Sequence, residues 1–205
     1  SGPCHLSLNH NGSHLFVANY GSGSIAMYAL MEDGSLAPCS DFHQHTGNSV
    51  NPERQEGPHA HMIRTTPDDR FALAADLGTD QLLIYRIDYG AHKLIPQSEL
   101  NFNVKAGQGP RHFEFHPQRL FLINELGNTL MSFEYEPQQG RISGPIQTLE
   151  TLPKGFRGLS STADIHIHPN GRFLYGSNRG HDSLIVCSLE AEDQILEVLA
   201  HVPSE

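Results

Sequence analysis

The stretch ADIHIHPNGRFLYGSNRGHDSLIVCSLE, residues 163–190, contains the pattern that decides the fold. Polar and apolar residues alternate from Asp164 to His168, as expected of a β-strand with two different faces. A turn at Asn170 and Gly171 follows, then a more apolar segment that ends in glycine, then a third alternating segment at 183–189. Short strands joined by such turns predict an antiparallel meander.

The same pattern occurs three more times in the chain. Its other copies are HLSLNHNGSHLFVANYG from His5, HMIRTTPDDRFALAADLG from His61 and HFEFHPQRLFLINELG from His112. The copies recur about every 50 residues and consist of strands only, which is typical of propeller blades. A β-sandwich also has many short strands, but it would not repeat one strand order, turn position and glycine four times. We therefore predict an all-β chain with a β-propeller fold, whose four repeats begin near residues 5, 61, 112 and 164 within residues 1–205.

A propeller leaves no sheet face exposed only when its ring of blades is closed. Four repeats are too few for the ring that this pattern predicts. We therefore expect the chain to be a partial propeller, a piece of a longer one.

Composition and charge restrict the possible functions. The chain has 205 residues, 38% of them hydrophobic, and is long enough to bury a core. Its 13 Lys and Arg are outnumbered by 23 Asp and Glu, and the net charge of −10 repels phosphate backbones and anionic lipids. No segment approaches the roughly 20 apolar residues of a membrane span, and no signal peptide is visible. We expect a cytoplasmic protein without nucleic-acid or membrane partners, and its oligomeric state is not predicted.

Equivalent repeat positions become neighbours in a propeller, because inner strands and their loops converge on the central axis. Aligned on the residue two before each strand-end glycine, the repeats place Asn19, Asp76, Glu125 and Asn178 at one position. The Asx residues are expected to hold turns through side chain to backbone hydrogen bonds. Glu is a poor turn former, so Glu125 is the candidate for chemistry.

Two arginines are expected near the same ring of residues. Arg111 precedes His112 at the start of the third repeat, and Arg179 follows Asn178 in the fourth. Arginine binds carboxylate or phosphate through two parallel hydrogen bonds. The sequence therefore predicts a basic throat suited to a small anionic substrate.

A long polar loop, residues 42–61, joins the first two repeats and is rich in histidine. Long loops in compact domains are often functional. Although His59 and His61 alternate with a spacing that metal ligands use, no complete ligand set is evident, and the three cysteines form no C-x-x-C pair. We expect no metal and no cofactor.

Four strings, taken in order, resemble one known family. They are QEGPHAHMIRTTPDDRFALAADLGTDQLLIY, GPRHFEFHP, INELGNT and ADIHIHPNGRFLYGSNRG. By these motifs the chain resembles the lactonase family of seven-bladed propellers, which includes 6-phosphogluconolactonases and is related to carboxymuconate lactonizing enzymes. The resemblance covers essentially the whole chain and implies that it holds about four of the seven blades.

The resemblance also implies a catalytic set of one histidine, two arginines and one glutamate. Carried over motif by motif, the set is His61 in PHAH, Arg111 in GPRH, Glu125 in NEL and Arg179 in NRG. We expect additional substrate-binding residues in the pocket wall, namely His5, His45, Arg54 and His59.

The implied activity is that of a carboxylic ester hydrolase of carbohydrate metabolism, in the pentose phosphate pathway, which opens 6-phosphoglucono-lactone or a related sugar lactone without a metal. Glu125 or His61 would take a proton from the attacking water, and the arginines would bind the oxyanion or the substrate phosphate. Two alternatives remain open. One is a carboxymuconate-type cycloisomerase with the same pocket, and the other is a non-catalytic propeller that binds a protein on its rim.

Overall fold

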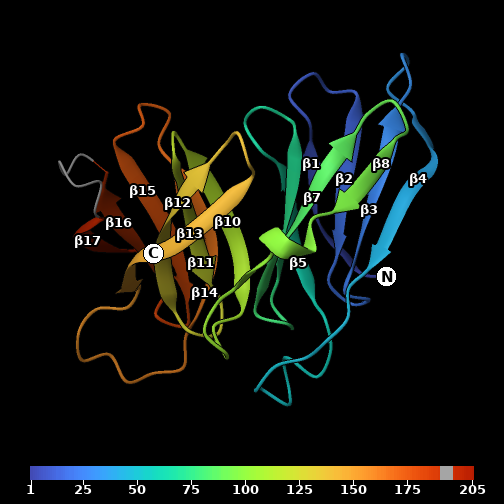
Figure 1. Ribbon diagram of the computed structural model, residues 1–205. Coiled ribbons are helices and arrows are strands. Elements are labelled where there is room, and N and C mark those ends of the chain that lie inside the picture. The colour runs from blue at the N-terminus through green and yellow to red at the C-terminus, as the bar shows by residue number, and fades with distance from the viewer. Residues whose placement is uncertain (190–195) are drawn as a thin grey trace. The chain divides into compact units, whose positions relative to one another are not determined.

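The computed structural model describes residues 1–189 and 196–205. Within these ranges the only helical element is one 3-10 turn, η1 (Ser98–Leu100). The strands form four antiparallel sheets, each a meander in chain order (Figure 1). The prediction of an all-β chain built from propeller-type blades is confirmed.

The first two sheets come from the first half of the chain. One contains β1 (Pro3–Leu8), β2 (His14–Asn19), β3 (Ser24–Leu30) and β4 (Leu36–Gln44). The next contains β5 (Ala60–Thr65), β6 (Phe71–Asp76), β7 (Gln81–Asp88) and β8 (Lys93–Pro96), and the short strand β9 (Phe102–Asn103) also pairs with β7.

The last two sheets follow the same order. The third contains β10 (Pro110–His116), β11 (Arg119–Asn124), β12 (Thr129–Glu136) and β13 (Arg141–Glu150). The fourth contains β14 (Ser161–Ile167), β15 (Phe173–Arg179), β16 (Ser183–Ser188) and β17 (Glu197–Pro203).

The chain divides into two compact units, and each is described by itself. Unit 1 consists of Ser1–Pro110 with Pro137–Gly140, and unit 2 consists of Arg111–Glu136 with Arg141–Glu205. In unit 1 the first two sheets share a buried apolar cluster, to which Phe16 and Met27 contribute from one sheet and Ile63 and Ala74 from the other.

Unit 2 has its own buried cluster, to which β11 and β12 contribute Phe121, Ile123 and Leu130, and the last sheet contributes Ile165 and Leu174. Burial of such side chains contributes about 25 cal/mol per Å² of apolar surface. In unit 1, residues Phe71–Asp76 of β6 are all buried, so both faces of this central strand are covered.

Each hairpin between the first and second strand of a sheet reverses at a residue with positive φ. These residues are Gly12 (69°), Asp69 (56°), Gln118 (58°) and Gly171 (72°). Such left-handed conformations favour Gly, Asn and Asp and match tight hairpin turns. All four lie in the turns that the sequence predicts.

The hairpins between second and third strands correct the predicted alignment of the repeats. Each has a positive-φ residue four positions after a strand-end Asx residue, namely Gly23, Asp80, Asn128 and Asp182. The side-chain amides of Asn19, Asn124 and Asn178 each donate to a hydroxyl five residues later. Asn124, and not Glu125, is therefore the equivalent of Asn19, Asp76 and Asn178.

The correction gives Glu125 a different set of equivalents. Counted from the strand-end Asx residue, Glu125 shares its position with Tyr20, Leu77 and Arg179. The glycine used for the predicted alignment lies one residue further from the Asx residue in the third repeat than in the others. Two of the predicted site residues, Glu125 and Arg179, thus occupy one repeat position.

β-Bulges interrupt the first strand of three sheets. The register shifts between Pro3 and His5 in β1, and between Ala60 and Met62 in β5. His61 is therefore the bulged residue, equivalent to Cys4, and the predicted equivalence of His5 with His61 is wrong by one position. A bulge redirects side chains and is common beside active sites. A similar shift lies between Thr162 and Ile165 in β14.

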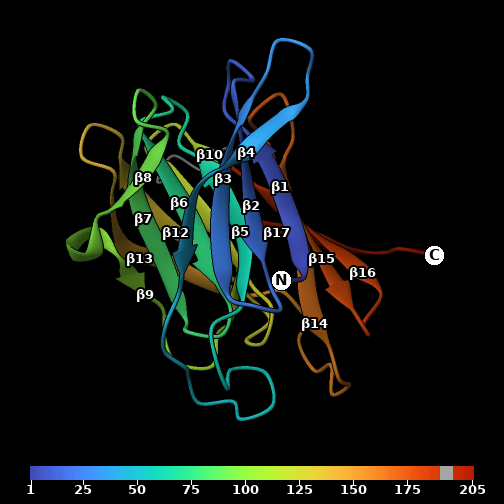
Figure 2. The same ribbon diagram turned by 90° about the vertical axis from the view of Figure 1, so that its right-hand side faces the viewer.

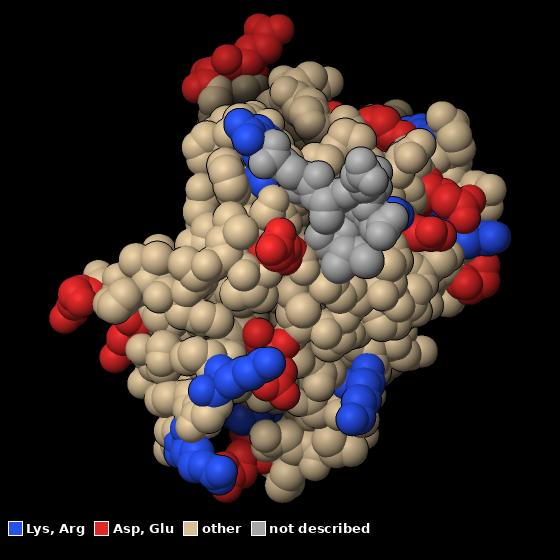
Figure 3. Space-filling view, turned by 90° about the vertical axis from the view of Figure 1, so that its left-hand side faces the viewer, with Lys and Arg blue, Asp and Glu red and all other residues tan. Residues whose placement is uncertain are grey.

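Two surface observations bear on partners. No helix within the described ranges is long and apolar enough to span a membrane. The face drawn in Figure 3 has acidic and basic side chains dispersed among uncharged ones. The absence of nucleic-acid and membrane partners stays a prediction.

Candidate active site

Three charged side chains of unit 2 meet at a single carboxylate oxygen. Arg111 lies in β10, Glu125 directly follows β11, and Arg179 ends β15. The Nε of Arg111 donates to Oε2 of Glu125 at 2.9 Å, and Nη2 of Arg179 lies 3.1 Å from the same oxygen. The structure thus brings together three of the four residues that the sequence proposes as catalytic.

Backbone carbonyls at the bulge of β14 hold both guanidinium groups. Arg111 donates through Nη1 to the carbonyl of Ala163 at 2.7 Å, and Arg179 donates through Nη2 to the carbonyl of Thr162 at 2.8 Å. Irregular pairing within this strand leaves such carbonyls available to side-chain donors. The orientation of each arginine is therefore fixed from two sides.

The three side chains differ in their access to solvent. Glu125 is 5% exposed and Arg111 14%, whereas half of the Arg179 side chain is exposed. Burial lowers the pKa of the Arg111 guanidinium from its ordinary value, Glu125 opposes this shift, and the charge of Arg179 adds to it. Taken alone, the two guanidinium groups and one carboxylate sum to one positive charge, whose accessible part is on Arg179, and the negative charge of Asp164 also acts on Arg111. This arrangement can bind a small anion.

A second polar network continues from β10 to β14 in unit 2. Asp164 Oδ1 lies 2.7 Å from Nδ1 of His112, and its Oδ2 lies 3.0 Å from Nε2 of His166. The hydrogen bond from His112 holds the pKa of Asp164 far below its ordinary value. His166 also lies 3.4 Å from Glu114. The sequence offered Asp164 only as a repeat position, and its pairing with His112 was not predicted.

In unit 1 an aromatic ring organises most of the remaining candidates. Tyr20 stacks on His59 with ring centres 4.4 Å apart, and it meets His61 edge to face at 5.5 Å. Its hydroxyl accepts a 3.2 Å hydrogen bond from Nη2 of Arg54. Tyr20 therefore contacts three predicted site residues. Together with Tyr20 they form what we call the Tyr20 cluster: Tyr20, Arg54, His59 and His61.

Sequence reasoning missed Tyr20 because its repeat position was hidden by the one-residue error. In the corrected alignment Tyr20 is the unit 1 equivalent of Glu125 and Arg179. An alignment anchored on the Asx residues instead of the glycines would have singled it out.

Asp76 holds the loop that carries this cluster. Its Oδ1 accepts backbone N–H groups from His59, Gly78 and Thr79 at 2.9 to 3.1 Å. Its Oδ2 lies 2.6 Å from Nδ1 of His45. As predicted for the Asx residues, the role of Asp76 is to hold a turn.

Two further predicted site residues are His45 and His5. His45 is 1% exposed at its side chain and contacts Asp76, and it is no member of the Tyr20 cluster. His5 is half-buried in β1, and its equivalent in the second repeat is Met62 and not His61. Since His61 belongs to unit 1 and the Arg111–Glu125–Arg179 group to unit 2, a joint site of all four stays a prediction.

Within residues 1–189 and 196–205, no three His, Cys, Asp or Glu side chains are arranged as a metal site. The free cysteines Cys4, Cys39 and Cys187 form no disulfide. Burial raises the pKa of the Cys187 thiol to about 12, so it packs as a small apolar residue.

The sheets, their bulges and the paired arginines define the class of protein. Residues 1–205 match the family described as "Lactonase, 7-bladed beta-propeller", and the chain belongs to this family. Among curated proteins it is 35% identical to the 6-phosphogluconolactonase of Bacillus subtilis over 99% of this chain and 57% of that protein. The chain thus spans little more than half the length of this relative.

Solved structures agree with this assignment. A periplasmic gluconolactonase from Pseudomonas aeruginosa is 32% identical, with a TM-score of 0.91 over 99% of this chain and 57% of that one. A protein from Lactobacillus plantarum is 31% identical, also with a TM-score of 0.91, over 99% of this chain and 58% of that one. The fold is that of blades of a seven-bladed propeller.

Proposed function

We propose that this chain is part of a lactonase that hydrolyses 6-phosphoglucono-lactone, or a related sugar lactone, to the open acid. The observation that carries the proposal is the pair of guanidinium groups on one oxygen of Glu125, in a chain of the lactonase family. A phosphorylated lactone is an anion, and so is the acid that its hydrolysis produces. The net positive charge of the group favours both.

Hydrolysis requires a water oxygen to bond to the ring carbonyl carbon and the ring C–O bond to break. A base takes the proton of the water and returns it to the departing ring oxygen, while negative charge builds on the carbonyl oxygen. In the proposal the accessible Arg179 donates to that oxygen or to the phosphate, because preorganised donors stabilise such charge strongly. Arg111, which is mostly buried, orients Glu125 and Arg179.

In the proposal His61 takes the proton of the attacking water, and Glu125 anchors the two arginines. Two guanidinium donors stabilise the charged form of a carboxylate and so weaken it as a base. His61 stands at a bulge with the edge of the Tyr20 ring against it, and such contacts restrict the orientation of an imidazole. Its part in the same reaction is proposed on its PHAH motif.

Substrate and location are the finer parts of the proposal. The name of the Bacillus subtilis relative supports the phosphorylated lactone. The pentose phosphate pathway and the cytoplasm are further parts of the proposal. The Pseudomonas aeruginosa structure is named a periplasmic gluconolactonase, so an unphosphorylated lactone and the periplasm are the outcomes to test against. Cell fractionation of the full-length protein decides the location.

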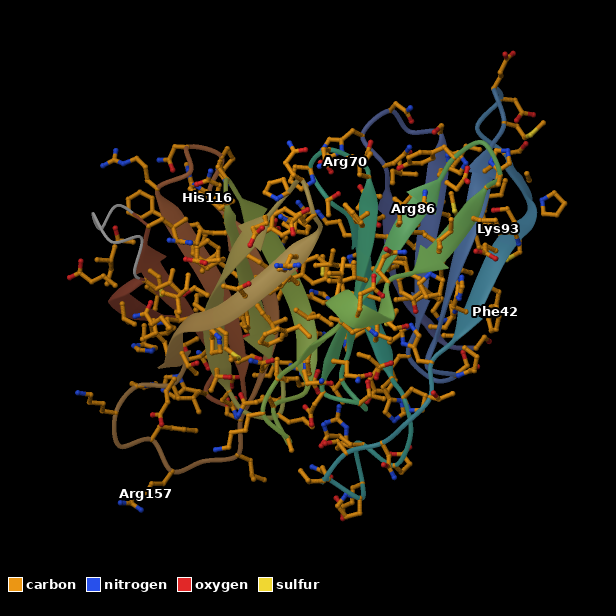
Figure 4. All side chains as sticks on the ribbon, in the orientation of Figure 1. Phe42, Arg70, Arg86, Lys93, His116 and Arg157 are labelled. Carbon is orange, nitrogen blue, oxygen red and sulfur yellow. The ribbon has the colours of Figure 1, made fainter. Side chains whose placement is uncertain are left out.

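The proposed activity is tested by assaying the full-length protein on freshly prepared 6-phosphogluconolactone and on gluconolactone. We expect acid release well above the spontaneous rate, and a loss of about 100- to 1,000-fold in Arg111→Ala, because Arg179, whose contribution as a preorganised donor is of that size, loses a group that orients it. Arg86→Ala is the matched control, because Arg86 is exposed on β7 and makes none of these contacts (Figure 4). Equal rates for all variants, none faster than spontaneous opening, would discard the proposal. Activity on carboxymuconate alone would select a cycloisomerase.

A further inference from the structure

We propose that Asp80 is a positioning residue, which holds Arg54 in place for the substrate anion. The inference rests on the proposed function, because that function gives Arg54 its predicted role of binding the substrate. Asp80 lies in the hairpin between β6 and β7 and is 3% exposed. Its φ of 56° is a left-handed conformation, which Asp adopts more readily than most residues.

The Asp80 carboxylate accepts four hydrogen bonds, all from uncharged donors. Its Oδ2 accepts the hydroxyl of Ser49 at 2.5 Å, the side-chain amide of Gln55 at 2.8 Å and the N–H of Gly107 at 2.7 Å. Its Oδ1 accepts the N–H of Gly109 at 2.7 Å. Two loops of unit 1 that lie far apart in sequence are therefore joined at one buried carboxylate. We call these five residues the Asp80 clamp.

The loop between β4 and β5 contains a turn that the clamp holds. This loop extends beyond the ends of the strands of unit 1 (Figures 1 and 2). Within it the N–H of Ser49 donates to the carbonyl of Gln55 at 3.0 Å, and the N–H of Gln55 donates to the carbonyl of Asn51 at 2.8 Å. The two residues whose side chains donate to Asp80 therefore also close this turn.

Arg54 belongs to the same turn. Its N–H donates to Oδ1 of Asn51 at 3.1 Å, and it directly precedes Gln55, which is fully buried. At the far end of its side chain, Nη2 donates to the hydroxyl of Tyr20 at 3.2 Å. An arginine side chain has many rotamers, so the position of its guanidinium depends on where the backbone is held. Release of the turn from Asp80 would therefore free the guanidinium to leave Tyr20.

Equivalent positions in the other repeats separate the role of the Asp80 side chain from the needs of the fold. In each repeat the backbone carbonyl at this position accepts the N–H of the residue that follows the last strand of the sheet. The four positions are Gly23, Asp80, Asn128 and Asp182. Gly23 does this without a side chain, and the carboxylate of Asp182 accepts the N–H of Gly180 within its own hairpin. The backbone carbonyl therefore serves the common fold, and the four hydrogen bonds of the Asp80 side chain are additional.

The kinetic test is a double-mutant cycle in the full-length protein, with KM measured for the lactone that the wild type opens. In Arg54→Ala we expect KM to rise about ten- to hundredfold, the cost of a charged hydrogen bond to the substrate. In Asp80→Asn we expect a rise of about five- to tenfold with kcat nearly unchanged, because the guanidinium is present but misplaced. In the double variant, Asp80→Asn should add less than about twofold to the effect of Arg54→Ala, since no guanidinium is left to position.

Asp69→Asn is the matched control in the same sheet. Asp69 also has a φ of 56°, and its carboxylate accepts the hydroxyl of Thr65 at 2.7 Å and the N–H of His10 at 2.9 Å. It lies at the other end of β6 from Asp80. We expect Asp69→Asn to lower Tm, as Asp80→Asn does, and to leave KM unchanged.

Hydrogen exchange tests the Asp80 clamp without a substrate. In Asp80→Asn the backbone amides of residues 49–55 and 107–109 should exchange at least about threefold faster than in the wild type, because the carboxylate no longer holds both loops. Ser49→Ala should show a weaker effect of the same kind, and it keeps three of the four hydrogen bonds, so it replaces Asp80→Asn in both tests if that variant does not fold. Ser35→Ala, which removes a 2.6 Å hydroxyl contact to a carboxylate in an exposed turn, is its control and should leave both loops unchanged.

Two results would overturn the inference. One is unchanged exchange of both loops in the clamp variants, and the other is a double variant in which the effects of Asp80→Asn and Arg54→Ala multiply in full, as they would for a merely structural residue. A wild type that opens no lactone would instead refute the proposed function. The exchange measurement would then still decide whether Asp80 holds the turn of Arg54, so the two failures are distinguishable.

Discussion

The two units place different chemistry at the same repeat position. Directly after the strand-end Asx residue, unit 1 has Tyr20 and Leu77, whereas unit 2 has Glu125 and Arg179. In unit 1 the position supports an aromatic cluster in which Tyr20 contacts two histidines. In unit 2 it supports an ionic group that includes Arg111.

The backbone around this position is nearly constant, so the difference lies in the side chains. Each copy has an Asx residue before the position and a positive-φ residue three positions after it. Such a scaffold fixes the direction of one variable side chain per sheet. Chemistry can therefore change from sheet to sheet without a change of fold, and in the proposed function unit 2 is the half that provides charge for an anionic substrate.

The largest expected effect follows from breaking the ionic group at its centre. Glu125→Gln in the full-length protein leaves two neighbouring guanidinium groups without their shared counter-charge, so both lose their orientation. We expect kcat/KM for the lactone to fall by about 100- to 1,000-fold, the range lost when a preorganised charged donor is no longer held in place. The measurement is a continuous assay of acid release. A rate within twofold of the wild type would show that Glu125 is only structural.

The next effect concerns the Asx position, which we expect to be structural in both units. Asp76 is fully buried and accepts four hydrogen bonds, so Asp76→Asn replaces one acceptor oxygen by a donor. We expect a loss of about 2–4 kcal/mol of unfolding free energy, or a fall in Tm of about 4–16 °C.

Calorimetry of the wild type and Asp76→Asn provides the measurement, and the activity of the folded fraction is the control. Below the melting transition the variant should hydrolyse the lactone at a rate close to that of the wild type. A large loss of activity with an unchanged Tm would contradict the assignment and place Asp76 in the site.

How much the sequence predicted can be judged at particular residues. The meander, the four turns and the meeting of Arg111, Glu125 and Arg179 were all predicted, because turn residues and repeat order are local signals. The equivalence of Glu125 with the Asx residues failed because the third repeat has its glycine one residue later. Bulges at His61 and Cys4 were not visible. A bulge shifts the following side chains by one position. In β6 both faces are buried, so its sequence has no alternation of polar and apolar residues from which the strand register could be predicted.

The burial of His45 was not predicted either. In sequence it belongs to a polar, histidine-rich segment, and we expected it in the wall of the substrate pocket. Its contact with Asp76 spans 31 residues and depends on how two sheets of unit 1 pack. Long-range pairs of this kind have no local signature.

A smaller effect is expected at Tyr20, where Tyr20→Phe removes the hydroxyl that Arg54 contacts and keeps the ring that stacks on His59. If the Tyr20 cluster serves substrate binding, KM should rise about three- to tenfold with kcat nearly unchanged, the cost of one hydrogen bond of about 1 kcal/mol. Tyr28→Phe in the same assay is the control, since Tyr28 lies in β3 outside the cluster. An unchanged KM would limit the site to unit 2.

The smallest expected effect is a difference between the units in how their folding stability depends on pH. Nε2 of His14 lies 2.8 Å from Nδ1 of His92. Burial lowers the pKa of His14 below its ordinary 6.5, and the charge of His92 is a second cause of the shift. The unfolded chain then binds the proton more readily than the folded one, so this stability is complete above pH 6.5 and is lost as the pH falls. Asp164 in unit 2, whose pKa is lowered from 3.8, contributes stability that is lost only in stronger acid.

His92→Asn tests this difference, because Asn tolerates the positive φ of residue 92 and carries no charge. We expect the fall in Tm between pH 7 and pH 5 to become smaller by at most about 4 °C, the scale of 1 kcal/mol in a domain of this size. A steeper fall in His92→Asn would contradict the account of the pair.

The central claim is that the accessible guanidinium of Arg179, fixed by Glu125 and the carbonyl of Thr162, receives the substrate anion. Its most direct test is kcat/KM for 6-phosphogluconolactone in full-length Arg179→Gln, with Tm measured on the same sample. The account predicts a loss of at least about 100-fold with a Tm within about 2 °C of the wild type, because half of this side chain is already in solvent. A variant that keeps wild-type kcat/KM would contradict it.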